Sequence, residues 1–140
     1  MPNNKNTERL SNYKNLIKSL QEYVKTHPDI IALYIFGSVA MKKDKKNSDV
    51  DLALIPKSKV NGFRRIDIET ELSNILKKNV DLVIFTDASP LLRHQILKNG
   101  HLVYENDRDE RIRHEVFSRF EYWDSNFLFK EINRSDKHAR

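Results

Sequence analysis

The chain of 140 residues has no cysteine, which excludes disulfide bonds and thiolate metal sites. It has no apolar run of membrane-spanning length, and its first ten residues lack the apolar core of a secretion signal. Hydrophobic residues make up 39% of the chain, a low fraction for a globular domain but above that of disordered chains. We therefore expect a cytoplasmic protein whose length suffices for a single core.

The charge balance is mildly basic. The chain carries 25 Lys and Arg against 20 Asp and Glu, a formal net charge of +5. A basic surface attracts phosphates, although the same balance also keeps a small protein in solution. The densest basic cluster pairs Lys42-Lys43 with Lys45-Lys46. A contact between these lysines and a triphosphate is one interpretation, simple solvation is the other, and direct nucleic-acid binding is less favoured than either.

Hydrophobic periodicity predicts helices that alternate with short strands. The expected strands are 30–36, 48–55, 80–85 and, at an edge, 101–104. The expected helices are 7–27, 62–78, 91–98 and 107–129, with a tail over 130–140. This order indicates one α/β (α+β) domain over 1–140, with its core at about 28–105. We expect a small mixed sheet of three to four strands flanked by helices.

The most informative motif lies between the first two strands. The first apolar run ends at Gly37-Ser38, ten residues follow, and Asp49-Val50-Asp51 opens the second run. Glycine lets a backbone approach a phosphate closely, and the serine hydroxyl and nearby N–H groups can donate to its oxygens. Chance would produce this four-residue pattern in about one such chain in a thousand. The motif predicts a site that binds a nucleoside triphosphate.

The two carboxylates at alternate positions predict a metal site. Side chains two apart on a strand share one face, so Asp49 and Asp51 point the same way. Their mutual repulsion is relieved by a divalent cation, and Mg²⁺ prefers a few carboxylates together with water and phosphate oxygens. Asp81 opens the third strand and completes a cluster of three if that strand lies alongside. Two metals held there would stabilise both oxygens of an in-line displacement.

Each of these residues also has a plain structural interpretation. Gly37-Ser38 could be an ordinary turn with a capping serine, and Asp49 a turn residue after Asn47-Ser48. Asp51 is harder to explain in this way, because a charge between apolar neighbours is uncommon in a buried strand. The five histidines show no spacing typical of zinc ligands. Taken together, the motif favours the catalytic interpretation.

The chain resembles the minimal nucleotidyltransferases of the DNA polymerase beta-like superfamily. The family pattern is an apolar residue with Gly-Ser, a ten-residue gap, Asp-x-Asp and a third Asp on the next strand. Here it is matched by Phe36-Gly37-Ser38, by Asp49-Val50-Asp51 and by Asp81. The resemblance implies that Gly37 and Ser38 hold the triphosphate, that Asp49 and Asp51 bind Mg²⁺, and that Asp81 helps to activate the attacking hydroxyl.

A chain of this length most resembles the MntA-type antitoxins of HEPN/MNT toxin–antitoxin systems. The resemblance implies an enzyme that transfers AMP from ATP to a tyrosine of a HEPN-domain toxin ribonuclease and so neutralises it. Many relatives carry Arg-Gly where this chain has Met41-Lys42. Lys42 or Lys43 is then the candidate for that phosphate contact, as a point charge.

Two alternatives stay open. The chain could neutralise a toxin by binding alone, or it could modify a small molecule, as aminoglycoside nucleotidyltransferases do. The retained aspartates argue against a pure binder, and the short chain leaves little room for a separate acceptor domain.

The last predicted helix carries an apolar stripe at spacings of four, four, three and four, formed by Ile112, Val116, Phe120, Trp123 and Phe127. The simplest interpretation is that this stripe packs on the sheet of the same domain. Further aromatic residues lie off the stripe, at Phe117, Tyr122 and Phe129. They suggest a second possibility, that the helix presents aromatic surface to a partner.

Overall fold

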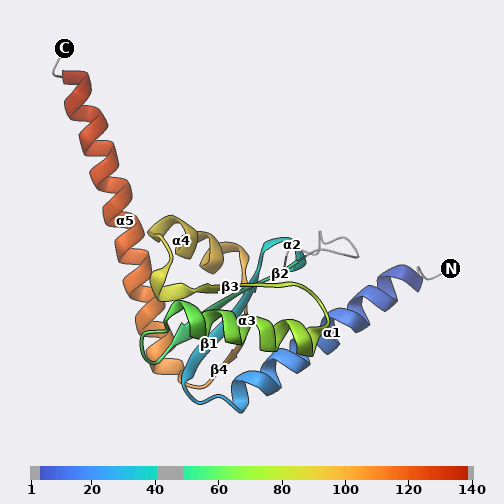
Figure 1. Ribbon diagram of the computed structural model, residues 1–140. Helices are drawn as coiled ribbons and strands as arrows, with labels where there is room; N and C mark the ends of the chain where they lie inside the picture. The colour runs from blue at the N-terminus through green and yellow to red at the C-terminus, as the bar shows by residue number, and fades with distance from the viewer. Residues whose placement is uncertain (1–3, 41–48, 139–140) are drawn as a thin grey trace.

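The computed structural model describes residues 4–40 and 49–138, with side chains described for 7–8, 10–40 and 49–124 (Figure 1). Its helices are α1 (Asn4–Lys25), α2 (Gly37–Ala40), α3 (Gly62–Leu76), α4 (Pro90–Asn99) and α5 (Arg108–His138). Its strands are β1 (Ile30–Phe36), β2 (Val50–Pro56), β3 (Val80–Ile84) and β4 (His101–Glu105), with a 3₁₀ turn η1 (Phe85–Asp87). No helix within these ranges is long and apolar enough to cross a membrane.

The four strands form one mixed sheet in the order β3-β2-β1-β4. Strand β1 is antiparallel to both of its neighbours, whereas β2 and β3 run parallel. Helix α3 makes the crossover that a parallel pair requires. The predicted mixed sheet is therefore confirmed, and so is the position of β4 at an edge.

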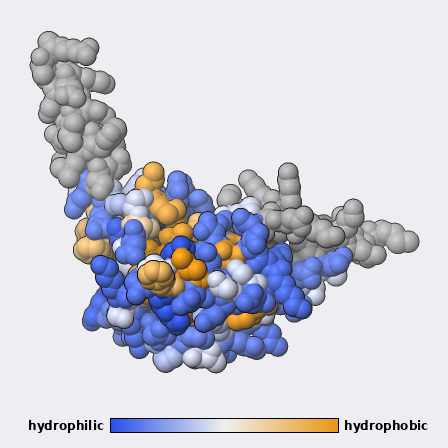
Figure 2. Space-filling model, viewed as in Figure 1, coloured by the Kyte–Doolittle hydropathy of each residue, from blue (hydrophilic) through white to orange (hydrophobic). Residues whose placement is uncertain are grey.

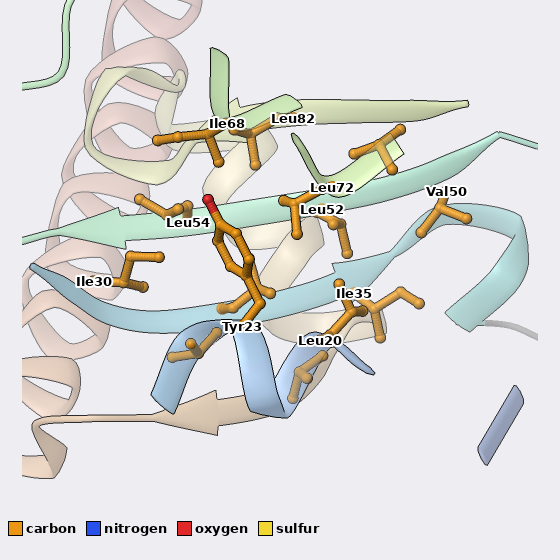
Figure 3. Packing of buried hydrophobic residues seen from close by; sticks show 14 of the residues in the cluster. Leu20, Tyr23, Ile30, Ile35, Val50, Leu52, Leu54, Ile68, Leu72 and Leu82 are labelled. Atoms are coloured by element: carbon orange, nitrogen blue, oxygen red, sulfur yellow. The ribbon is translucent and has the colours of Figure 1, made fainter. Parts of the chain in front are cut away.

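Helices α1 and α3 cover one face of the sheet and enclose the larger part of the core (Figure 3). Leu20 and Tyr23 reach this core from α1, and Ile68 and Leu72 reach it from α3. The strands contribute alternate residues, as a pleated sheet requires: Leu33 and Ile35, Val50, Leu52 and Leu54, and Val80, Leu82 and Ile84.

The opposite face carries a smaller buried cluster beneath α4. It contains Tyr34 of β1, Ala53 and Ile55 of β2, Phe85 of η1 and Ile96 of α4. Helix α5 lies beside α4 and extends away from the body of the domain toward the C-terminus (Figure 1). The residues of β2 and β3 that do not face the larger core point toward this second face.

Local capping explains where α3 and α4 begin and end. The Asn61 side chain accepts a hydrogen bond from the backbone N–H of Arg64, and the Ser89 hydroxyl accepts one from that of Leu92. Lys77 ends α3 in the left-handed conformation, with φ of 52°. Helix α3 is therefore two residues shorter than the predicted 62–78.

Helix α5 differs from the prediction in length. It continues to His138, although the sequence analysis ended it at residue 129 and treated 130–140 as a tail. No proline or glycine occurs after Gly100, so nothing in the local sequence stops the helix at residue 129.

Helix α5 also differs in the face that it turns inward. Packing of the stripe on the sheet is wrong for its described members, because Ile112, Val116, Phe120 and Trp123 are exposed. Polar side chains of α5 face the sheet and α4 instead, and they form hydrogen bonds and ion pairs there. Phe127 and Phe129 lie beyond the described side chains.

Candidate active site

Gly37 forms the tight turn where β1 ends, and its φ of +73° lies in the region that favours glycine. A Cβ atom at this position would lie 2.1 Å from Oδ2 of Asp51. No side chain larger than hydrogen fits there. Gly37 and the Asp51 carboxylate are therefore packed directly against each other.

Asp51 and Asp81 stand opposite each other on the parallel strands β2 and β3. Val50 and Leu52 point into the larger core, so the carboxylates point to the other face. Asp49 precedes β2 and is exposed. Strand β3 thus lies alongside the Asp-x-Asp motif. This was the condition under which the sequence predicted a cluster of carboxylates.

Burial and repulsion both act on the Asp51 carboxyl group. Partial burial raises its pKa above the ordinary value, and the negative charges of Asp81 and Asp49 raise it further. The fold thus holds these negative charges close enough that they make ionisation of Asp51 less favourable. Such an arrangement costs stability in the isolated chain, and a bound cation would relieve it.

The three carboxylates do not form a ready-made metal cage. Among the described residues, no three His, Asp or Glu side chains are gathered tightly enough to enclose an ion. Mg²⁺ usually keeps several waters and needs only one or two carboxylates besides phosphate oxygens. The pair of Asp51 and Asp81, with the exposed Asp49 beside it, fits that ligand requirement through the chemistry of its oxygens.

His101 is a residue near the site that the sequence analysis did not single out. Its Nε2 atom lies 3.2 Å from the carbonyl oxygen of Ala40 and donates to it in the matching tautomer. This bond ties the end of α2 to the start of β4. Ser38 lies in the same short helix and is partly buried. Lys42 and Lys43, the other predicted phosphate contacts, lie outside the described residues.

A hollow of about 210 Å³ lies elsewhere, between α4 and α5. Its walls are His94, Leu97, Lys98, Ser118 and Arg119. None of the predicted site residues lines it. The hollow is therefore separate from the carboxylate pair of Asp51 and Asp81.

The comparisons with known proteins agree with this geometry. The model of the family "Polymerase beta, Nucleotidyltransferase" matches residues 18–109, which include the Gly-Ser turn and all three aspartates. The chain belongs to this nucleotidyltransferase family. Nucleotidyltransferases act on a nucleotide substrate. The family match also confirms the nucleotidyltransferase fold that the resemblance implied.

The chain is also similar to proteins whose activity is described. Protein adenylyltransferase MntA of Shewanella oneidensis is 27% identical over 101 residues, covering 72% of this chain and 70% of the relative. A solved toxin–antitoxin structure with AMP-PNP has a TM-score of 0.74 at 20% identity, covering 86% of this chain and 98% of the solved one. A complex of tri-AMPylated Shewanella oneidensis HEPN toxin with MNT antitoxin has a TM-score of 0.66 at 21% identity, covering 92% and 98%.

Proposed function

We propose that this chain is an antitoxin that transfers AMP from ATP to a tyrosine of a HEPN-domain toxin ribonuclease and thereby neutralises it. The observation that carries the proposal is the register of Asp51 against Asp81 beside the Gly37 turn. Membership of the nucleotidyltransferase family supports the chemistry. The similarity to an MntA protein adenylyltransferase and to toxin–antitoxin complexes supports a protein acceptor.

In the proposed reaction the chain first positions the triphosphate. The Gly37 turn leaves the backbone open to close approach, and the Ser38 hydroxyl donates to a phosphate oxygen. Lys42 or Lys43 supplies a positive charge in place of the arginine of many relatives. These contacts hold the α-phosphorus in line with the incoming hydroxyl.

Asp49, Asp51 and Asp81 would hold Mg²⁺, as two ions, whose charge stabilises the attacking and leaving oxygens. Asp81 accepts the proton of the tyrosine hydroxyl, whose ordinary pKa near 10 makes a base useful. The tyrosine oxygen forms a bond to the α-phosphorus, and the bond from that phosphorus to the bridging oxygen of the β-phosphate breaks. Pyrophosphate leaves, and AMP remains on the tyrosine.

One observation keeps a second function in view. Helix α5 exposes several large apolar side chains, which would suit an antitoxin that acts by binding alone. The carboxylates support the first function, because like charges held together bring no benefit to a pure binder. A small-molecule acceptor has no comparable support in the fold.

The test uses α-labelled ATP, Mg²⁺ and the purified product of the adjacent gene. We expect the partner to gain one or more AMP groups by mass spectrometry, and Asp49→Asn and Asp51→Asn to abolish this gain. Neutralisation that persists in full with both variants would instead show inhibition by binding alone. Modification of an aminoglycoside but of no protein would show a small-molecule enzyme.

A ranking of the site residues refines the test. Ser38→Ala should reduce the rate of transfer less than Asp49→Asn or Asp51→Asn does, because backbone N–H groups still contact the phosphates. Equal losses in all three variants would contradict the role given to the Ser38 hydroxyl.

A further inference from the structure

Helix α5 is attached to the domain by an unusually polar inner face. Arg111 forms ion pairs with Glu105 and Glu115, and Glu115 accepts a 2.6 Å hydrogen bond from the Tyr34 hydroxyl. Farther along, Arg93 of α4 pairs with Glu121 of α5. The polar side of the helix is thus already occupied within the domain.

The opposite side of α5 is apolar and faces away from the sheet. We call its five described side chains the outer stripe: Ile112, Val116, Phe117, Phe120 and Trp123. They are between 40% and 64% exposed. Figure 2 shows apolar side chains at the surface where α5 passes α4. A surface helix normally turns such a stripe toward its own core, so this orientation is the reverse of the usual one.

The area of the outer stripe suits the centre of a protein interface. Its three aromatic side chains are each about 60% exposed, which corresponds to roughly 300–450 Å² of ring surface. Exposed apolar patches of this size usually mark a binding site. A stable interface needs about 800 Å² from each partner, so the stripe would form the apolar centre and a polar rim would complete it.

Charge favours a partner other than a second copy of the chain. The formal net charge of +5 repels an identical molecule and attracts an acidic one. Arg113 and Arg119 border the stripe with side chains that are 76% and 60% exposed, and Arg113 is paired with Glu110 at 2.8 Å. Arg119 is held only loosely, at 3.7 Å from Glu115. It is therefore available to a carboxylate on a partner.

We propose that the outer stripe docks the acceptor protein of the transfer reaction, through a helix of that protein with an apolar centre and acidic flanks. This inference rests on the proposed function. The stripe lies on α5, apart from the Gly37 turn and the start of β2 (Figure 1). Docking and chemistry thus use different residues, and the acceptor is recognised as a folded surface rather than by its tyrosine alone.

The test measures the affinity of the chain for the purified product of the adjacent gene, by titration calorimetry. We expect Phe117→Ser/Phe120→Ser to weaken binding at least 100-fold, since buried aromatic anchors dominate interfaces. The matched control is Phe63→Ser on α3, which removes a phenylalanine that is 85% exposed and should leave binding unchanged. Melting temperatures should stay similar, because both changes remove exposed side chains.

The outcomes separate docking from chemistry. Asp51→Asn should bind the partner as tightly as the unmodified chain does, and its failure to transfer AMP concerns the proposed function alone. If the double variant binds as tightly as the unmodified chain, or transfers AMP with an unchanged KM for the partner, the docking proposal is overturned while the proposed function stands. Absence of binding by the unmodified chain also overturns it. So does a stripe-dependent dimer of this chain in sedimentation, which would identify a second copy as the occupant.

Discussion

Gly37 lies so close to Asp51 that the Cβ atom of any other residue would meet the Asp51 Oδ2 atom at 2.1 Å. Gly37 begins α2 directly after β1, Asp51 lies in β2, and the two residues are 14 positions apart in the chain. Their contact links the turn expected to hold phosphate to the carboxylate expected to hold metal. A change at either residue should therefore disturb both functions together.

Replacing Gly37 by alanine should abolish AMP transfer and destabilise the domain. The φ of +73° alone costs an L-residue about 1–2 kcal/mol, and the clash displaces the Asp51 carboxylate. Urea unfolding and the transfer assay measure the two effects. Gly62→Ala is the control, since its added Cβ would meet nothing within 4 Å. Full activity of Gly37→Ala would contradict the proposed geometry.

Asp51→Asn should raise the melting temperature of the metal-free chain while it removes activity. The pKa of Asp51 is higher in the folded chain than in the unfolded one, because burial and neighbouring charges disfavour its ionised form. The folded state therefore binds this proton more tightly. That contribution to stability is complete below the unfolded pKa near 4 and is lost as pH rises through the folded pKa.

At pH 7 the ionised Asp51 thus destabilises the fold, and the neutral asparagine should melt a few degrees higher. The gain should shrink as the pH falls toward 4, where aspartic acid is itself neutral. Asp67→Asn changes the net charge equally at an exposed position of α3 and should show no such gain. Mg²⁺ with a non-hydrolysable ATP analogue should stabilise the unmodified chain more than Asp51→Asn. Equal melting curves at every pH would refute the repulsion at this site.

His101 should affect catalysis by anchoring α2. Its hydrogen bond to the Ala40 carbonyl contributes about 0.5–1.5 kcal/mol if it is typical. His101→Phe should therefore slow transfer by up to about tenfold, chiefly through a higher KM for ATP. His101→Gln retains a donor and should recover most of the loss. If both variants match the unmodified chain, α2 is positioned without this bond.

The sequence predicted the strands well because strong local signals bound them. Strand β1 agrees at both ends, since Pro28 and Gly37 flank a run of buried residues. Asp81 was expected to join the cluster if the third strand lay alongside the second, and the register of β2 and β3 places it opposite Asp51. The roles assigned to the three aspartates, to Gly37 and Ser38 and to the two lysines stay predictions.

The orientation of α5 could not be predicted from its own sequence. The apolar stripe from Ile112 to Trp123 was a strong amphipathic signal, and it pointed to the wrong face. The deciding contacts are with distant residues, because Glu115 meets Tyr34 across 81 positions and Glu121 meets Arg93 across 28. Such partners become visible only when the fold brings their strands and helices together. His101 was not identified from the sequence for the same reason, because its partner Ala40 is distant in the chain.

The bond between Tyr34 and Glu115 gives the last prediction. Burial, and then the hydrogen bond to Glu115, raise the pKa of Tyr34 well above its ordinary value near 10. The folded chain therefore keeps this proton when the unfolded chain loses it, so the stabilisation is complete below pH 10 and declines above it. Tyr34→Phe should lower the free energy of unfolding at pH 7 by about 1 kcal/mol. It should also flatten the decline in the free energy of unfolding above pH 10, as followed by circular dichroism during urea unfolding.

Tyr104→Phe is the control, because it removes a hydroxyl from the neighbouring strand β4. This variant should keep most of the decline above pH 10. An unchanged decline in Tyr34→Phe would show that α5 is not held through the bond between Tyr34 and Glu115.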